Sequence, residues 1–448
     1  MSGNWRFSSG VFMLFLLAVL FAASSAEAQE EDRHFTLERC VREALSNNWG
    51  VKARQERIEE STYVKEQAKA DFLPKLSTSF GYTRMDDVRY SNSVPLGGGL
   101  FIPGRPQNTE DNYTWRTSLR QPLFTGFALL SAYELAKLGV DRSEMELELE
   151  KLDLVLQAKE SYFNILRADK GVEVGRMDVE SRESHVEVAK NFYDVGIIPI
   201  NDLLKAEVEL ANSRQALVKV ENAAALVRAS FNRLLARPVN LPVEVEPMWT
   251  YVPETVDFDQ AMNRAVQQRP EIRLVDLAIQ QADQQIRLAK SKFYPEVSFV
   301  FDYIKEGDQW DVSGDDFHDP DRWQATALLS WTFWEWGKTV SAAREKLSAR
   351  KQLMINKAGL VDGVSLEIRQ AALELDQTEK NIPTTKKAVE QAEENLRVNQ
   401  ERYKAQVTTM TEVLDAQTLL TQARVNYYTA LIEHQVAKAR LQRAMGEN

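Results

Sequence analysis

The apolar residues of this chain recur at helical spacing over long stretches, and in four short stretches they alternate with polar residues instead. A helical period predicts one helix over residues 36–70, and it stops before Pro74 because proline cannot continue the hydrogen-bond ladder. The period then falls to two, which predicts a half-apolar strand. A second alternating stretch begins at Tyr113 and is expected to end at Pro122, with residues 95–103 predicted as part of the loop between the strands.

A very long helix is predicted next, because no proline stands between Leu123 and Ile198. Only Gly171 and Gly175 interrupt the pattern, and a bend is expected near them. A break containing glycine and proline follows, and a return helix is expected from Asn201 as N-cap to about residue 237. Such a break between two amphipathic runs is typical of the tip of a helical hairpin.

The whole pattern then occurs a second time. The first helix and strand recur 221 residues later and the long helix and tip recur 210 residues later, so that Tyr403 matches Tyr193 and Glu412 matches Asp202. The repeating unit is helix, strand, strand, long helix and return helix, which indicates a duplicated architecture. We therefore expect a signal peptide at 1–28, a first repeat at 29–237, a linker at 238–256 and a second repeat at 257–448.

The N-terminal residues have the pattern of a secretory signal: Arg6, an apolar run over residues 11–23 and an Ala26-Glu-Ala28 cleavage site. Beyond them no apolar run reaches the ~20 residues of a membrane-spanning helix. Entry into a membrane would then need a β-barrel. Four strands are too few to close one, since membrane barrels have at least about eight, so several copies would be required.

Charge and composition exclude several function classes. The formal net charge is −11, which makes nucleic acid a poor partner. The single cysteine, Cys40, allows no internal disulfide and lies on an apolar helical stripe, so a buried small residue is expected rather than a reactive thiol. We expect no enzyme and no cofactor, because the histidines at positions 34, 185, 318 and 434 are scattered and form no recognised catalytic motif.

Six aspartates crowd the second inter-strand loop, at positions 308, 311, 315, 316, 319 and 321. Their spacing does not match the calcium-binding loop of an EF-hand. A solvated loop is the favoured interpretation, with contact to divalent ions left open, and no metal site is assigned.

Several short motifs occur in the same order in both repeats. They are Phe72-Leu-Pro74 and Phe293-Tyr-Pro295 before the first strands, Pro122-Leu-Phe124 and Phe333–Lys338 after the second strands, and the tips Asp194–Ile197 and Val413–Ala416. With these motifs, nearly all of the chain after the signal resembles the outer-membrane factor family, the TolC-like exit ducts.

The resemblance implies a mainly α fold with a membrane β-barrel. Members are homotrimers whose twelve strands form one barrel in the outer membrane, continued by a long α-helical barrel in the periplasm. It also implies a passive channel that is gated at its periplasmic tips and belongs to a tripartite efflux or type I secretion system. The implied partners are a periplasmic adaptor (membrane fusion) protein, an inner-membrane pump of RND or ABC type, and outer-membrane lipid.

The same resemblance implies a gate and a docking surface at the tips. Glu412 and Asp415 share one helix face, and with Asp202 and Tyr403 they would form the gate and an acidic selectivity ring. The alternative is that acidic residues merely favour a helix N-terminus. A charged latch is not expected, since Thr408 stands where some members have an arginine. The adaptor-docking residues would be Val195, Gly196, Ile197, Gln406, Val407 and Thr408.

Aromatic residues are concentrated in the strand regions, and they predict contact with the membrane interface, where Trp and Tyr accumulate. The predicted interface residues are Tyr82, Tyr113, Trp115, Trp323, Trp331, Trp334 and Trp336. The alternative to a channel is a periplasmic helical spacer without a pore. The two strand pairs argue against it.

Overall fold

The computed structural model describes residues 33–104, 107, 109–249, 256–315 and 319–447. The expected signal peptide therefore lies outside the described residues. The chain divides into two compact units. We call Glu56–Glu144 with Arg273–Ala358 the sheet unit, and Met1–Gln55, Met145–Ile272 and Gly359–Asn448 the helical unit.

The sheet unit contains a four-stranded antiparallel sheet of order β2-β5-β7-β8. Its strands are β2 (Lys75–Arg84), β5 (Asp111–Thr125), β7 (Glu296–Gly307) and β8 (Asp321–Ser330). In the pairing register, residues that point to one face of a strand lie beside residues that point to the same face on the neighbouring strand. One face of the sheet therefore carries the aromatic and apolar residues, among them Leu76, Phe80, Tyr82, Tyr113, Trp115, Leu119, Phe299, Phe301, Tyr303 and Trp323.

The opposite face of the sheet is largely polar and is cross-linked by hydrogen bonds. Asp302 of β7 accepts one from the hydroxyl of Ser118 on β5 and one from Gln324 Nε2 on β8, the latter at 2.9 Å. At the end of β7, Gly307 pairs with Gly314, and both Ile304 and Val312 are buried there. The two faces thus differ in chemistry, as the alternation predicts.

Two strand predictions were wrong in detail. β5 continues through Pro122 to Thr125, because a register shift between Pro122 and Phe124 allows the ladder to continue past the missing N–H. The predicted loop at 95–103 contains a hairpin of β3 (Val94–Gly97) and β4 (Leu100–Ile102). Its turn uses Gly97, Gly98 and Gly99, all at positive φ.

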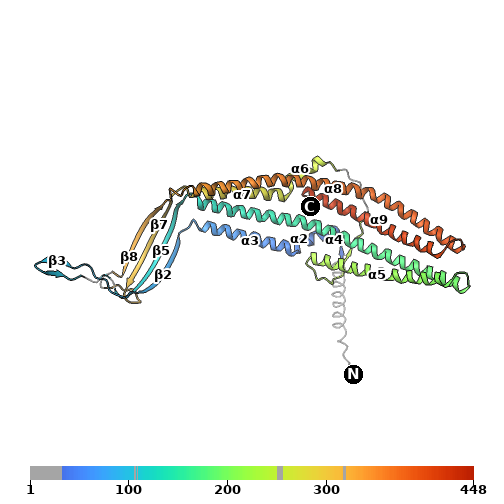
Figure 1. Ribbon diagram of the computed structural model, residues 1–448, viewed down its shortest axis with the longest axis horizontal. Helices are drawn as coiled ribbons and strands as arrows, with labels where there is room; N and C mark the ends of the chain where they lie inside the picture. Colours follow the sequence, from blue (N-terminus) through green and yellow to red (C-terminus); the bar gives the residue numbers. More distant parts are fainter. Residues whose placement is uncertain (1–32, 105–106, 108, 250–255, 316–318, 448) are drawn as a thin grey trace, which may run out of the picture. The chain divides into compact units, whose positions relative to one another are not determined.

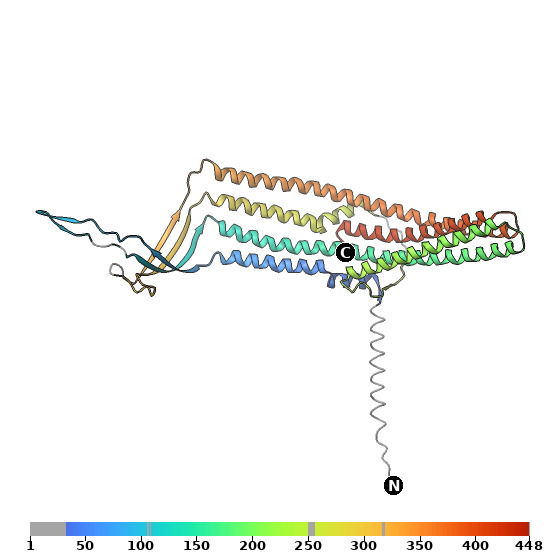
Figure 2. The same cartoon turned by 60° about the horizontal axis from the view of Figure 1, so that its bottom comes forward.

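Four helical segments run side by side in the sheet unit, in the same order as the strands (Figure 2). They belong to α3 (Trp49–Ala70), α4 (Ala128–Asp194), α7 (Pro270–Ser291) and α8 (Lys338–Lys404). Ser61 of α3 and Ser143 of α4 join their hydroxyls at 2.7 Å, and Lys357 of α8 pairs with Asp276 of α7 at 2.6 Å.

The single helix expected over 36–70 is two helices, α2 (Leu37–Asn47) and α3. Asn48 separates them with an extended backbone, at φ −57° and ψ 135°. Its side chain accepts from Gly50 N–H and donates to the carbonyl of Leu234, so both sides of the break are satisfied. In the second half, Arg269 separates α6 (Phe258–Gln268) from α7 in the same way.

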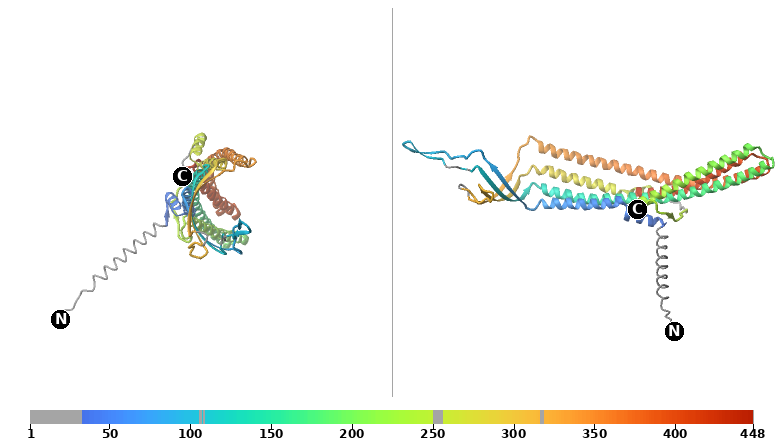
Figure 3. Two further views of the ribbon diagram at one scale, coloured as in Figure 1. Left: turned by 90° about the vertical axis from the view of Figure 1, so that its left-hand side faces the viewer. Right: turned by 90° about the horizontal axis from the view of Figure 1, so that it is seen from below.

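The helical unit is built around the long helices α4 and α8, of 67 residues each, and their return helices α5 (Ile200–Leu234) and α9 (Met410–Met445). The two hairpins lie next to each other as far as their tips (Figures 1 and 3). A short parallel pair joins β1 (His34–Phe35) and β6 (Glu244–Val245). Cys40 is fully buried there, and burial raises the pKa of its thiol to about 12, which removes its reactivity at neutral pH.

The glycines of the first long helix lie inside the continuous helix α4 and face its neighbour. A Cβ on Gly175 would stand 3.2 Å from Leu217 of α5, and one on Gly171 would stand 3.4 Å from Val220. These glycines therefore permit close packing of α4 against α5. Pro383 is likewise contained within the continuous helix α8.

The element bounds recur at fixed offsets. α6 begins and α7 ends 221 residues after α2 begins and α3 ends, while α4 and α8 differ by 210 residues at both ends. Among the described residues, no helix is long and apolar enough to cross a membrane.

Candidate functional site at the helical tips

Both hairpin tips fold as the same turn, in which two orphan carbonyls at a helix end are satisfied by the next two amides. After α4, Ile197 N–H donates to the Phe192 carbonyl at 2.8 Å and Gly196 N–H donates to the Tyr193 carbonyl at 2.9 Å. After α8, Val407 N–H and Gln406 N–H make the corresponding bonds, both at 2.9 Å.

This turn needs a left-handed residue at its centre. Gly196 has φ +77°, and Gln406 in the second tip has φ +61°. Glycine adopts that conformation without strain, whereas a residue with a Cβ pays about 1–2 kcal/mol. The second tip thus keeps the geometry of the first without its glycine.

The return helices start without the expected side-chain cap. The N-cap of α5 is Pro199, and Asn201 lies inside the first helical turn, so the N-cap prediction was wrong. In the second hairpin the N-cap is Thr409, whose side chain also makes no capping bond. The turn geometry and the packing below it, rather than a cap, fix where these helices begin.

One hydrophobic cluster packs the two tips together. Its buried members come from all four long helices: Ala189, Leu203, Ala206, Leu396, Tyr403, Met410, Val413, Leu414, Ala416 and Leu420. Phe192 of α4 packs against it, with its ring centroid 5.5 Å from that of Tyr403. At the rim, Lys205 Nζ of α5 donates to Thr411 Oγ1 of α9 at 2.9 Å.

Tyr403 lies inside this cluster, with only 5 % of its surface exposed. Its hydroxyl is buried and has no hydrogen-bond partner within the described part of the chain. Burial, and then the nearby charge of Asp202, raise the pKa of this phenol. A buried hydroxyl without a partner is costly, so Tyr403 is the tip group that most needs a further contact.

The three tip carboxylates are placed differently. Glu412 and Asp415 are exposed in the first turns of α9, while their neighbours Val413 and Leu414 are buried, so both acids lie on the face away from the cluster. Asp202 is half-buried in the first turn of α5. The acidic pair of the second hairpin is therefore available to solvent, whereas Asp202 is close enough to act on Tyr403.

Apolar side chains project from both tips. Val195 and Val407 are 69 % and 63 % exposed, and Ile197 is 45 % exposed. Thr408 is half-buried and Gln406 is exposed. A Cβ added at Gly196 would meet nothing within 4 Å, so the surface around this turn is open.

A buried polar network between α4, α5 and α9 was missed from the sequence. Asp178 accepts from Arg182 Nε and Gln417 Nε2, each at 2.9 Å, and from Thr421 Oγ1 at 2.7 Å. Arg182 also reaches Thr418 at 3.1 Å and Glu209 at 3.2 Å.

Ser181 and His185 extend this network along α4. Ser181 donates to Gln417 Oε1 at 2.7 Å and lies 3.4 Å from His185 Nε2. The side chains of Asp178, Arg182, His185 and Gln417 are nearly inaccessible to water. The only sequence signal is that Asp178, Arg182 and His185 follow one helical stripe, which resembles an ordinary solvated face until α9 is seen to cover it.

The predicted membrane-interface aromatics all belong to the sheet unit. Tyr82, Tyr113, Trp115 and Trp323 share the aromatic face of the sheet. Trp331, Trp334 and Trp336 lie beyond β8, are more than half exposed, and precede α8. Trp331 Nε1 donates to the Phe293 carbonyl at 3.2 Å, which ties this segment to the end of α7.

In the described part of the aspartate-rich loop, two of the aspartates accept hydrogen bonds from protein groups. Asp321 accepts from the Tyr303 hydroxyl at 3.1 Å, and Asp311 accepts from Ser313 N–H at 3.3 Å. Over the ranges that the structure describes, no cluster of His, Cys, Asp and Glu is arranged to hold a metal ion. Asp316 and His318 fall outside those ranges.

Comparison with known proteins gave one family and a consistent set of structures. The family model described as "Outer membrane efflux protein" matches residues 40–237 and 261–447. Among solved structures, the CmeC outer membrane channel of Campylobacter jejuni superimposes with a TM-score of 0.77 at 15 % identity, over 92 % of this chain and 85 % of that one.

Two further structures agree. The outer membrane protein VceC of Vibrio cholerae has a TM-score of 0.73 at 17 % identity and covers 92 % of this chain and 96 % of its own. The open state of the MtrE outer membrane channel of Neisseria gonorrhoeae has a TM-score of 0.71 at 17 % identity, over 92 % and 89 %. At such identities the likeness shows the fold. A search of the curated proteins gave no match.

Proposed function

This chain belongs to the outer membrane efflux protein family, the TolC-like channels, and on that premise we propose that it is the exit duct of a tripartite efflux or type I secretion system. The family is a class of outer-membrane channels and not a class of enzymes. The duct would be passive, with the energy supplied by a partner pump, and would open and close at its helical tips.

The main support for this proposal comes from the two edge strands of the sheet. β2 and β8 are the edge strands, each 10 residues long and exposed along their whole length, and no further strand among the described residues pairs with either of them. Long unpaired edges are a liability that proteins cover or pair. Strands of about 9–11 residues also match the thickness of a bilayer.

Pairing β8 of one copy with β2 of the next satisfies both edges, and the strand directions alternate correctly for an antiparallel junction. Three copies would give a barrel of twelve strands, within the range of closed membrane barrels. We propose that the aromatic face contacts outer-membrane lipid, with Trp331, Trp334 and Trp336 at an interface, and that the polar face lines the lumen. The helices would continue as an α-helical barrel in the periplasm.

At the tips we propose a gate made of Glu412, Asp415, Asp202 and Tyr403. In a trimer, Glu412 and Asp415 supply six carboxylates around the axis, which would favour cations and repel anions. Their exposure on α9, away from the hydrophobic cluster, supports this role. The buried Tyr403 hydroxyl would find its missing partner only when the tips rearrange or meet a neighbour.

The exposed apolar side chains at the two turns support a docking role. We propose that Val195, Gly196, Ile197, Gln406, Val407 and Thr408 contact a periplasmic adaptor protein, which links the duct to an inner-membrane pump of RND or ABC type. Two repeats, at 29–237 and 257–448 with a linker at 238–256, would supply the two turns of each copy.

The test is single-channel conductance in planar bilayers, comparing the wild type with Glu412→Ala/Asp415→Ala. The expected result is a small, cation-selective current whose selectivity is lost in the double variant, because the charge ring is removed. A matched control is Lys404→Gln/Glu401→Gln, which removes an exposed ion pair at the end of α8.

A current with unchanged selectivity in Glu412→Ala/Asp415→Ala would place the constriction elsewhere. Absence of any current from folded, reconstituted trimers would reject the duct and leave the periplasmic spacer.

A further inference from the structure

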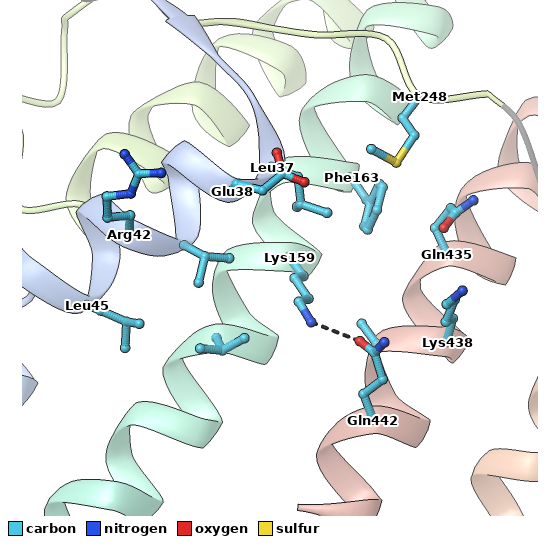
Figure 4. A pocket seen from close by; sticks show the side chains of 13 residues that line it. Leu37, Glu38, Arg42, Leu45, Lys159, Phe163, Met248, Gln435, Lys438 and Gln442 are labelled. Carbon is cyan, nitrogen blue, oxygen red and sulfur yellow. Dashed lines mark hydrogen bonds between the residues drawn. The ribbon is translucent and has the colours of Figure 1, made fainter. Parts of the chain in front are cut away.

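A groove in the helical unit is lined by residues of α2, α4 and α9, and it contains none of the tip residues (Figure 4). Its volume is about 620 Å³, in the range of sites that hold small molecules. Much of the lining is apolar, and its larger apolar side chains come from α2, from α4 and from the segment after β6: Leu37, Val41, Leu45, Val155, Phe163 and Met248.

The polar atoms of the groove carry an excess of positive charge. Lys159 of α4 and Lys438 of α9 line it together with Arg42 of α2, and among the described residues of the lining Glu38 is the one acid. Lys159 is half-buried and donates to Gln442 Oε1 at 2.9 Å (Figure 4). Within the described residues, neither Lys159 nor Arg42 lies within ion-pair distance of a carboxylate.

Lys159 differs from the neighbouring arginines of the helical unit, because within the described residues it has no carboxylate partner. The neighbouring arginines of α9 are each paired more than once: Arg443 with Asp153 at 2.8 Å and Glu271 at 2.9 Å, and Arg440 with Glu160 at 3.0 Å and Glu374 at 2.7 Å. A half-buried ammonium without a carboxylate is unfavourable, and burial and then the charge of Lys438 lower the pKa of Lys159. The cationic groove also contrasts with a chain of net charge −11.

We propose that this groove binds an amphiphilic anion: a single acyl chain lying along the apolar lining, with a carboxylate head that pairs with Lys159. The apolar residues would replace water around the chain, and the carboxylate would supply the counter-charge that Lys159 lacks. This binding does not depend on a conducting pore.

The test is photo-crosslinking of the full-length protein in phosphatidylcholine nanodiscs with a diazirine-bearing dodecanoic acid. Mass spectrometry then maps the labelled peptides, so that ligand dissolved in the lipid is distinguished from ligand in the groove. The expected label lies on peptides that contain residues 37–45, 155–163 or 248. Unlabelled laurate is expected to compete, and its neutral glycerol ester is expected to compete at least about tenfold less well.

Lys159→Met keeps an apolar side chain of similar length and removes the charge. We expect it to lower groove labelling about tenfold or more, while Lys151→Gln, at a half-buried lysine of the same helix that pairs with Glu148, leaves it unchanged. A second variant, Leu45→Trp, narrows the groove and should lower labelling without touching the cation.

Three results would overturn the proposal. They are equal competition by laurate and its neutral ester, labelling of the groove that is unaffected by Lys159→Met, and absence of label from the groove in the wild type. The last result would mean that another copy of the chain or a protein partner covers this surface.

Discussion

The two hairpins of this chain match in their turns and in the length of their first helices, but they differ in the side chains that they bury. Their tips make the same turn bonds, and α4 and α8 have the same length. Yet α4 carries Asp178 and Arg182 in a buried network, and the residues 210 positions later in α8 are Ala388 and Ala392. The backbone of a helical hairpin is therefore set by its length and turn, while the side chains decide how it is held against its neighbours.

The buried network of the first hairpin also bonds to the second hairpin. The polar groups of the first hairpin reach α9 of the second through Gln417, Thr418 and Thr421, so they fix one hairpin against the other. Apolar packing alone tolerates sliding, whereas hydrogen bonds between buried groups demand one register. The first hairpin thus specifies the register, and the second supplies exposed carboxylates.

The largest expected effect comes from breaking this network. Asp178→Ala leaves the Arg182 guanidinium buried without its main partner, and we expect a loss of about 3–5 kcal/mol in the free energy of unfolding, measured by urea titration of the helical circular dichroism. The double variant Asp178→Ala/Arg182→Met gives the first hairpin an apolar interior like the second and should recover most of that loss. A loss below about 1 kcal/mol in the single variant would show that the network does not hold the hairpins together.

A smaller effect is expected from exchanging the two turn residues. Gly196→Gln places a side chain at φ +77° and should destabilise the protein by about 1 kcal/mol. Gln406→Gly relieves the same conformation at φ +61°, but it also loosens the unfolded chain, so the gain should be about 0.5 kcal/mol. Lys190→Gln, on the exposed side of α4, is the control. If Gly196→Gln and Gln406→Gly both stabilise the protein, or both destabilise it, the two turns are not equivalent.

The smallest effect is expected from His185, which should change the free energy of unfolding only in mildly acidic solution. Burial, and then the positive charge of Arg182, lower its pKa below the ordinary value of 6.5, although Asp178 acts the other way. The unfolded state therefore binds more protons below about pH 6.5, and the free energy of unfolding falls as the pH drops through that window toward the folded-state pKa.

His185→Asn copies residue 395 of the second hairpin and should reduce this acid dependence while leaving stability near pH 8 almost unchanged. Urea midpoints measured across pH 5–8 check it. An identical pH slope in the wild type and the variant would assign the acid response to other groups.

Much of the architecture follows from local pattern. The period of two located all four strands of the sheet, and the proline-free stretch located the long helix α4, because both signals depend only on neighbouring residues. The order of motifs identified the family, which the family model confirms. The roles of the tip carboxylates, the docking residues and the interface aromatics stay predictions.

Other features needed contacts between residues far apart in the chain, and there the sequence was insufficient. The break at Asn48 depends on a carbonyl 186 residues away, and β5 passes Pro122 only because β7 tolerates a bulge beside it. The burial of Tyr403 likewise depends on a cluster drawn from four helices that are far apart in the sequence. Sequence alone determined the periods, the turns and the family, because these are local; tertiary structure decided which polar residues are buried and paired, because burial depends on what packs above them.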